Sequence, residues 1–422
     1  MNTQTPPAHL TTPFTAEPIQ SRERIEVLDV IRGFALLGIL IANMSMFSSP
    51  AMFLDIVGEN PWTGFWNKLT TSFINLFVQG KFYSMFSFLF GLGFSIFLER
   101  AKTRTAKPVK LFHRRLFVLL IIGLIHAFFI WSGDILVSYA LLGFLLPLFF
   151  NVKPKTLLLW ALALFLVFIM FMSLLMGMID LLKSAQEDIF NQALGPFIAE
   201  TEKTIANSYH AYGNGTFGEI MSQRAVDSLF ALSQVFMNVF IIFPLFLIGL
   251  YAGKKEIFQN IEANLPFIKK VWTWSFVIGF ILSLVKFAAK TRMAEDFFSF
   301  NTAIHFGAGV FADTGLCLFY ITTLVLLCRN TKWMARLRPL AYMGRMALSN
   351  YLLQSIICTI IFYNYGLGLY GKVGPAWGLV LTLVIYIVQI FISKYWFKYF
   401  RFGPMEWVWR SLTYRRRFKM RL

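Results

Sequence analysis

Long apolar segments separated by short polar ones recur along almost the whole chain. A helix needs about 20 apolar residues to cross the hydrocarbon core of a bilayer, and most of these segments approach or exceed that length. Gly80 and Lys81 interrupt the second segment, which indicates either a broken helix or an interfacial piece followed by a span. We expect about ten membrane-spanning helices: Val27–Phe47, Thr71–Leu98, Leu116–Trp131, Ile135–Phe150, Leu157–Leu182, Leu229–Tyr251, Val271–Ala289, Ile304–Leu327, Ala341–Tyr363 and Trp377–Phe397.

The composition supports an all-α integral membrane protein in contact with lipid. Hydrophobic residues make up 57% of the chain and charged residues only 14%, whereas an average soluble domain has about 25% charged residues. A net charge of +18 would suggest nucleic acid as a partner in a soluble protein. Here the lysines and arginines lie mainly in short loops between apolar segments, so we expect no nucleic-acid binding and interpret the charge as a topology signal.

Basic residues gather in every second loop, which places both termini in the cytoplasm. The basic stretches are residues 22–24, 100–115, 153–155, 254–270, 329–338 and 415–421, and the loop from Lys286 to Arg292 is the one exception. This pattern divides the chain into a disordered cytoplasmic tail (1–25), a first helical half (26–182), an extracytoplasmic loop (183–226), a second helical half (227–402) and a basic cytoplasmic C-terminal tail (403–422). We expect the extracytoplasmic loop to be either a functional lid or a partly helical, solvated cap.

The first apolar segment carries Asp29, Arg32 and Asn43, three polar residues on nearly the same helical face. Polar groups within membrane helices are costly and often mark a functional path. The alternative for Asp29 and Arg32 is an ion pair at the headgroup boundary, but Asn43 lies deeper. Lys81 is a candidate to bind a carboxylate such as Asp29 or a phosphate, and its alternative is to snorkel toward the interface.

His126 and Asp134 flank a tight turn at Ser132 and Gly133, and we expect this turn to bring them together. A histidine oriented by a carboxylate can act as a general base on a hydroxyl or an amine. The alternative is that Asp134 caps a helix and His126 bonds to a helix carbonyl. His305 and Asp313 form a weaker second candidate pair.

Asn350 and Gln354 lie one helical turn apart in an apolar segment. They are candidates to bind a substrate, or to hydrogen-bond to a neighbouring helix as packing contacts. The three cysteines have no CxxC spacing, so we expect packed thiols. Without a clustered set of His, Cys and Asp we expect no tightly held metal.

Four motifs in order resemble the YeiB-type bacterial membrane proteins: LDVIRGFALLGILIAN, RRLFVLLIIGLIHAFFIWSGDILVSYALLG, GRMALSNYLLQS and FGPMEWVWRSLTY. The resemblance covers almost all of residues 24–414. The opening D-x-x-R-G-x-A pattern is also similar to the transmembrane acyltransferase superfamily, which includes glycan O-acetyltransferases and the lysosomal heparan-alpha-glucosaminide N-acetyltransferase. The O-acetyltransferase branch usually has His at the position of Asn43, whereas the heparan branch resembles this chain in having Asn.

The resemblance implies a bacterial inner-membrane enzyme that moves an acyl group, typically acetyl, from cytosolic acyl-CoA to a glycan or other extracytoplasmic acceptor. The implied donor-side residues are Asp29, Arg32, Lys81, Arg114 and Arg115. His126 and Asp134 would be catalytic, while Asn43, Asn350 and Gln354 would bind substrate. A transporter or a lipid- or small-molecule-binding protein is the alternative, a scaffold or sensor is the third, and a homo-oligomer stays open for all of them.

Overall fold

The computed structural model describes residues 25–422, so the tail expected over residues 1–25 falls outside it except for Ile25. The described part of the chain is helical, and its one β-bridge joins Phe400 to Arg421. The helices are α1 (Glu26–Ser48), α2 (Ala51–Val57), α3 (Phe65–Phe77), α4 (Lys81–Lys102), α5 (Pro108–Phe129), α6 (Leu136–Gly143), α7 (Leu146–Phe149), α8 (Pro154–Ala185), α9 (Glu187–Asn214), α10 (Phe217–Ser233), α11 (Val235–Ile241), α12 (Phe243–Lys254), α13 (Leu265–Glu295), α14 (Phe300–Cys328), α15 (Thr331–Arg345), α16 (Ala347–Phe362), α17 (Pro375–Trp396) and α18 (Pro404–Tyr414).

Several of these helices are long and apolar enough to cross a membrane. Within residues 25–422 there are 7 such spans, namely α1, α3 with α4, α5, α8, α13, α14 and α17, and up to 9 if each of two bent pairs counts as one. The bent pairs are α10 with α11 (43°) and α15 with α16 (77°). The protein is therefore an all-α, multi-pass integral membrane protein in contact with lipid, as the sequence predicts, with somewhat fewer continuous spans than the expected ten.

In two of the expected spans that are divided into shorter helices, a proline lies at the start of one of the helices. The segment Ile135–Phe150 consists of α6 and the single turn α7, which has Pro147 in its first turn. The segment Leu229–Tyr251 runs through the end of α10, α11 and most of α12, and Pro244 lies in the first turn of α12. Proline lacks a backbone N–H, so it is accommodated in a first turn and disrupts a continuous helix.

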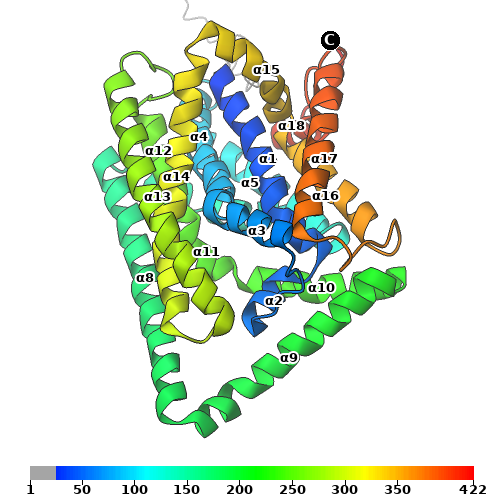
Figure 1. Ribbon diagram of the computed structural model, residues 1–422. Coiled ribbons are helices and arrows are strands. Elements are labelled where there is room, and N and C mark those ends of the chain that lie inside the picture. Colours follow the sequence, from blue (N-terminus) through cyan, green and yellow to red (C-terminus); the bar gives the residue numbers. More distant parts are fainter. Residues whose placement is uncertain (1–24) are drawn as a thin grey trace, which may run out of the picture.

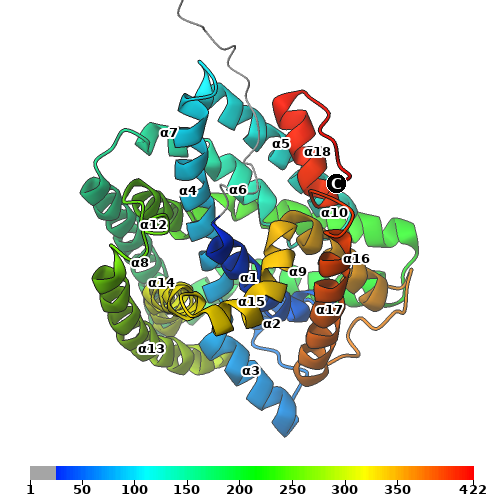
Figure 2. The ribbon, with the colours of Figure 1, turned by 90° about the horizontal axis from the view of Figure 1, so that it is seen from above.

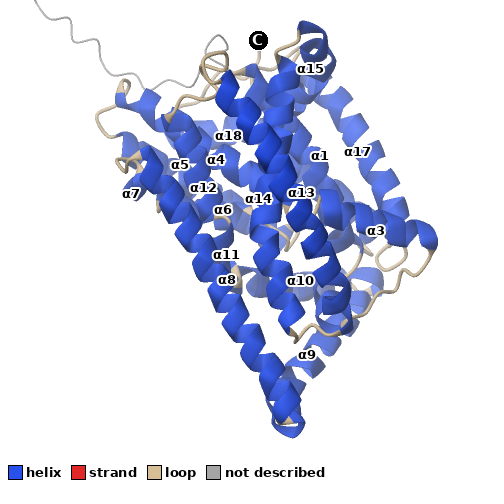
Figure 3. Cartoon of the chain, turned by 60° about the vertical axis from the view of Figure 1, so that its left-hand side comes forward, coloured by secondary structure: helices blue, strands red, loops and turns tan. Residues whose placement is uncertain are grey.

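Residues 183–226, which were expected to form an extracytoplasmic loop, are largely helical. This agrees with the alternative that they form a partly helical cap. Helix α9 has 28 residues and connects the far end of α8 to α10 across one end of the bundle (Figure 1). Helix α8 has 32 residues, about 48 Å at the usual rise, and reaches beyond its neighbours to meet α9 (Figure 3). Glu187 and Asp188 in the first turn of α9 favour a helix start there, because acidic groups stabilise the helix dipole.

Helix α1 lies near the centre of the bundle, surrounded by the other spans (Figure 2). Its close approach to α15 depends on two glycines: a Cβ on Gly33 would lie 2.0 Å from the Leu340 oxygen, and one on Gly344 would lie 1.9 Å from the Asp29 oxygen. This contact places the Asp29 end of α1 beside the end of the bundle that carries α15 and the C-terminus (Figure 1), which the charge pattern predicts to be cytoplasmic.

Candidate functional site

The predicted pairing of His126 and Asp134 is confirmed. His126 lies in the last turn of α5, and its Nδ1 is 2.7 Å from Oδ2 of Asp134 in the turn that follows. The other carboxylate oxygen, Oδ1, accepts a hydrogen bond from the backbone N–H of Val137 at 2.8 Å in the first turn of α6. The carboxylate thus orients the imidazole and caps a helix at once, so the two alternatives for Asp134 are compatible.

The second ring nitrogen of His126 is free. Nε2 is buried and has no hydrogen-bond partner in residues 25–422, and the His126 side chain is 1% exposed. The rings of Tyr351 and Trp131 lie 5.2 Å and 6.3 Å from the imidazole. When Nδ1 donates to the carboxylate, a neutral imidazole presents an unprotonated Nε2 that can accept a proton.

A small pocket lies against the same turn, on the side of the molecule crossed by α9. It encloses about 60 Å³, space for several water molecules or for one polar end of a larger molecule. Five separate segments meet there, as is typical of ligand-binding sites. Its walls are Ser132 and Gly133 of the turn, Ser208 and Tyr212 of α9, Asp227, Phe230 and Ala231 of α10, Tyr363 and Tyr370 after α16, and Met46 with residues 49–53 in the stretch that leads from α1 into α2.

The polar groups of this pocket are only partly satisfied. The Tyr212 hydroxyl donates to Asp227 Oδ2 at 2.5 Å, and its ring stacks on that of Tyr363 at 4.3 Å. Burial, followed by the neighbouring Tyr363 and Asp227, raises the pKa of Tyr212 well above its ordinary value, so the hydroxyl keeps the proton that it donates. The Ser208 hydroxyl is buried and has no partner in the described part of the chain, which leaves it available to a ligand.

Arg224 lies beside this pocket and was not predicted from the sequence. It is 1% exposed, its Nη1 donates to the Phe129 oxygen at 2.8 Å, and its guanidinium lies 5.5 Å from the Tyr363 ring centre. Its Nε and Nη2 are buried without a hydrogen-bond partner among the described residues. The signal was available: Arg224 and Asp227 lie three residues apart in a mainly apolar helical segment, the same pattern that singled out Asp29 and Arg32.

The ion pair between Asp29 and Arg32, given above as the alternative for these two residues, is present at the α15 end of the bundle. Arg32 Nη1 lies 2.7 Å from Asp29 Oδ1, and the Asp29 side chain is buried while that of Arg32 is 31% exposed. Asn43 follows on the same helix, is half-buried, and forms no side-chain hydrogen bond within the described range. Arg32 is therefore the member of this group that is accessible from the predicted cytoplasmic side.

Arg114 and Arg115 contact the C-terminal helix α18. Arg114 Nη1 donates to the Thr413 oxygen at 3.2 Å, and the Arg115 guanidinium lies 4.1 Å from the Trp409 ring centre. The indole N–H of Trp409 in turn donates to the Arg115 oxygen at 2.8 Å. A donor role for these two arginines is still a prediction, but it would require their contacts with α18 to rearrange.

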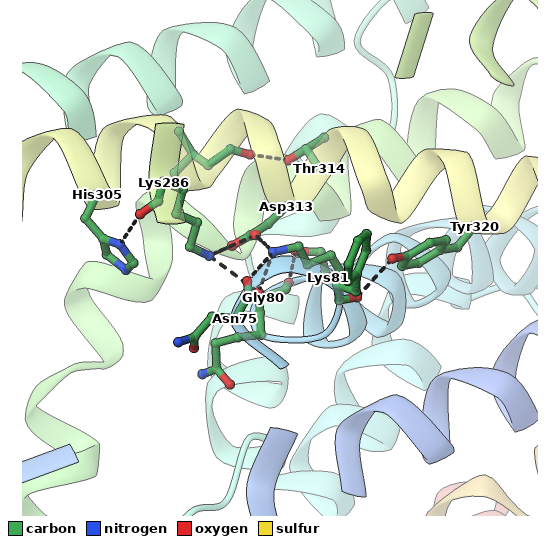
Figure 4. Close-up of polar contacts among 12 residues, drawn as sticks. Asn75, Gly80, Lys81, Lys286, His305, Asp313, Thr314 and Tyr320 are labelled. Atoms are coloured by element: carbon green, nitrogen blue, oxygen red, sulfur yellow. Dashed lines mark hydrogen bonds and ion pairs between the residues drawn. The ribbon is translucent and has the colours of Figure 1, made fainter. Parts of the chain in front are cut away.

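Lys81 binds a carboxylate, one of the alternatives expected for it, but its partner is Asp313 and not the suggested Asp29. Its Nζ lies 2.9 Å from Asp313 Oδ1, and the side chain is fully buried. The adjacent Phe82 packs against Gly38, nine residues beyond Asp29, which corresponds to about 13 Å along α1. The expected pairing of His305 with Asp313 is also wrong, because His305 Nδ1 lies 3.1 Å from the Lys286 oxygen (Figure 4).

Asn350 and Gln354 contact helix α17. Asn350 Nδ2 donates to the Ser393 hydroxyl at 3.0 Å, and Gln354 Nε2 donates to Gln389 Oε1 at 2.9 Å. These are the contacts expected from the packing alternative. The substrate-binding prediction now depends on Gln354 Oε1, which is buried and accepts no hydrogen bond from residues 25–422.

Metal-ligating side chains are dispersed in the structure. No group of three or more His, Cys, Asp and Glu side chains comes together within the described range, and Cys317 and Cys358 are buried as free thiols. The site residues available for chemistry are thus the His126–Asp134 pair, the polar pocket beside it and the buried ionic groups.

These features define a multi-pass α-helical membrane protein with a buried His–Asp pair toward one end and a partly exposed Asp–Arg ion pair toward the other. Residues 252–416 match the family described as Protein of unknown function (DUF418). The chain is 40% identical over 414 residues to "Uncharacterized protein YxaH" of Bacillus subtilis (strain 168), covering 94% of this chain and 96% of the relative. It is 28% identical over 419 residues to "Uncharacterized protein YeiB" of Escherichia coli (strain K12), covering 93% and 97%. The protein belongs to this YeiB-like DUF418 family.

Proposed function

We propose that the protein is a bacterial inner-membrane acyltransferase that moves an acyl group, typically acetyl, from cytosolic acyl-CoA to an acceptor on the opposite side, such as a glycan. The observation that carries this proposal is the buried His126, with Nδ1 fixed by Asp134 at 2.7 Å and Nε2 free. The resemblance of the opening D-x-x-R-G-x-A segment to transmembrane acyltransferases supports the same reaction class. Its relatives are bacterial, in agreement with the proposed membrane.

In this reaction His126 acts as the general base. Nε2 takes the proton of the acceptor hydroxyl or amine as the acceptor atom attacks the thioester carbonyl carbon of acyl-CoA. The carbon–sulfur bond then breaks, the acyl group stays on the acceptor and CoA leaves as the thiolate, which receives a proton. Asp134 stabilises the imidazolium formed in between, and a positioned general base typically accelerates such a step about 10²–10⁴-fold.

The two substrates would approach from opposite ends. Arg32, exposed at the α15 end, would contact the donor phosphates, and rearrangement of α18 would add Arg114 and Arg115. The pocket that shares Ser132 and Gly133 with the His126–Asp134 turn would hold the acceptor. The half-buried Asn43 amide and the unpaired Gln354 Oε1 are the remaining candidates for substrate contacts between them.

Calorimetry of acetyl-CoA binding to the purified protein tests the donor half of the proposal. We expect the wild type and His126→Ala to bind acetyl-CoA and Arg32→Ala to lose binding. Arg338→Ala is the matched control, because Arg338 pairs with Glu26 at the same end but both side chains are largely exposed. Absence of binding by an intact, monodisperse wild type would overturn the proposal.

Transport of a small molecule is the second candidate, favoured by one specific observation. Lys81, at the point where α3 gives way to α4, is paired with Asp313 inside the bundle, and interrupted helices with buried charges are a common feature of transporters. Solute uptake into sealed vesicles that depends on an ion gradient, together with absence of acyl-CoA binding, would favour this candidate.

A further inference from the structure

Three ionisable side chains from three different helices meet inside the bundle where α3 ends (Figure 4). The carboxylate of Asp313 on α14 lies 2.9 Å from Lys81 Nζ of α4 and 2.8 Å from Lys286 Nζ of α13. All three side chains are at most 9% exposed. Neither the ion-pair prediction for Lys81 nor the proposed acyl transfer accounts for the second lysine.

The sequence placed Lys286 near the end of the expected span Val271–Ala289 and at the start of the loop from Lys286 to Arg292, the one exception to the charge pattern. In the structure α13 continues to Glu295, so Lys286 is a helical residue facing α14. The exception therefore marked a buried charged group and not a topological anomaly.

The cluster has one more potential positive charge than negative charge. With both lysines protonated and Asp313 ionised, its net charge is +1, and a buried net charge costs free energy in a medium of low dielectric constant. Loss of one proton makes the cluster neutral. Burying this extra charge permanently costs free energy, and leaving the two lysines without Asp313 would cost more. Charged groups that are kept inside a membrane protein at such a cost usually have a functional role.

The end of α3 stabilises the charged form. Lys81 Nζ donates to the Gln79 oxygen at 3.0 Å and to the Asn75 oxygen at 3.2 Å, in addition to Asp313. These carbonyls belong to the negative end of the α3 dipole, so they favour the cations. The Tyr320 hydroxyl donates to the neighbouring Phe77 carbonyl oxygen at 2.9 Å, so a side chain of α14 also holds this end of α3 in place.

The same hydrogen-bond acceptors also suit the neutral form of the cluster. Lys286 Nζ donates to Asp313 Oδ1 and Oδ2 at 2.9 Å and 2.8 Å, and its third contact, to the Gln79 oxygen, is long at 3.4 Å. A neutral amine retains two N–H donors, enough for both carboxylate contacts. Release of one proton therefore gives up only the longest hydrogen bond.

The other titratable groups near the cluster differ between its two sides. Toward the far end of α13 lie His305, whose Nδ1 contacts the Lys286 oxygen, and Lys290, which pairs with Asp55 at 2.7 Å. Around the rest of the cluster are Tyr83, Cys317 and Tyr320, whose types ordinarily keep their protons at neutral pH.

We infer that Lys81, Lys286 and Asp313 form a proton-binding site inside the membrane, in which the two amines hold one readily dissociable proton. The site alternates between a charged form with both lysines protonated and a neutral form with one amine. This inference does not rest on the proposed acyl transfer and applies equally to a transporter.

Nitrogen-15 NMR of the full-length protein, labelled at lysine Nζ and reconstituted in lipid nanodiscs, tests this inference. We expect signal from the cluster to move from the ammonium to the amine position between about pH 6 and about pH 9, below the value of about 10.4 near which an exposed lysine titrates. Lys290→Met, which removes the neighbouring ion pair on the same helix, should retain this change. If every lysine signal stays at the ammonium position until exposed lysines titrate, the inference is overturned.

Single substitutions provide a second readout. In Lys286→Met or Lys81→Met the remaining lysine has Asp313 to itself, so its signal should no longer change over this pH range. A remaining lysine that titrates as in the wild type would contradict the shared proton. If one variant does not fold, the other carries the same comparison, and the wild-type titration alone still decides whether a dissociable proton exists.

Discussion

The Nδ1 atom of His126 and the Oδ2 atom of Asp134 lie 2.7 Å apart, while Oδ1 of the same carboxylate caps α6 through the Val137 N–H. One carboxylate thereby fixes both the hairpin between α5 and α6 and the tautomer of the imidazole. The orientation of the candidate base is thus built into the backbone of the turn, since displacing Asp134 would also remove the hydrogen bond to α6.

Asp134→Asn should separate these two roles. The Asn oxygen can still accept from Val137, so the cap survives, but its NH₂ group donates toward Nδ1 and moves the imidazole proton to Nε2. Because a protonated Nε2 cannot take the acceptor proton, we expect acyl transfer to fall about 10²–10⁴-fold with a small change in thermal stability. Transfer of radiolabelled acetyl from acetyl-CoA measures this, with Ser184→Ala, at an exposed position on α8 outside the pocket, as the control. Full activity of Asp134→Asn would exclude His126 as the base.

Gly80→Ala should destabilise the protein and disturb the buried ionic cluster. Gly80 has a φ of 92°, and a Cβ there would lie 1.9 Å from Asp313 Oδ2. We expect a loss of about 1–2 kcal/mol from the backbone conformation alone, with a further loss from displacement of the carboxylate. Gly93→Ala, on the same helix with no atom within 4 Å of its Cβ, should be neutral or stabilising by up to about 1 kcal/mol. Thermal unfolding in one detergent compares them, and equal melting temperatures would contradict the prediction.

Local patterns predicted the fold class and the contacts between residues close in sequence. Apolar periodicity identified the spans, and the interruption at Gly80 and Lys81 and the turn at Ser132 and Gly133 lie where the sequence placed them. Asp29 with Arg32 and His126 with Asp134 pair over three and eight residues. In each case the geometry of one helix or one turn decides whether the side chains meet.

Contacts between distant segments could not be predicted in the same way. Lys81 and Asp313 are 232 positions apart, as their numbers show, and which carboxylate Lys81 meets depends on how α4 and α14 pack. Arg224 was missed because residues 183–226 were assigned to a loop, and Asp227 because it precedes the expected span Leu229–Tyr251, whereas α10 runs from Phe217 to Ser233 and holds both. The packing contacts of Asn350 with Ser393 and of Gln354 with Gln389 likewise require the position of α17.

Asn350 should contribute to stability through Ser393. We expect Asn350→Leu and Ser393→Ala each to destabilise the protein, and the double-mutant cycle to give a coupling of about 0.6 kcal/mol and at most about 1.7 kcal/mol, the mean and the maximum measured for hydrogen bonds between membrane helices. Equilibrium unfolding in mixed micelles measures the coupling. A loss of acyl transfer in Asn350→Leu under conditions where the variant is fully folded would instead support the predicted substrate contact.

Glu406 of α18 should make stability depend on pH, because its buried carboxylate caps α16. Its Oε1 accepts from the Leu348 and Ser349 N–H groups at 2.7 Å and 3.2 Å, and Oε2 accepts from the Ser349 hydroxyl at 2.5 Å. Burial raises the pKa of Glu406 above its ordinary value, and the hydrogen bonds from Ser349 and Leu348 offset this only in part.

A carboxyl group whose pKa is raised on folding holds its proton more tightly in the folded state. Its contribution to stability is therefore fully present below the unfolded value of about 4.3 and is lost as pH rises through the raised folded pKa. Glu406→Gln keeps an oxygen for the two N–H groups and cannot ionise, so its melting temperature should lack this fall between mildly acidic and neutral pH. Glu406→Ala leaves the N–H groups unpaired and should cost about 1–3 kcal/mol at every pH. Parallel pH profiles for the wild type and Glu406→Gln would show that Glu406 does not titrate differently in the folded protein.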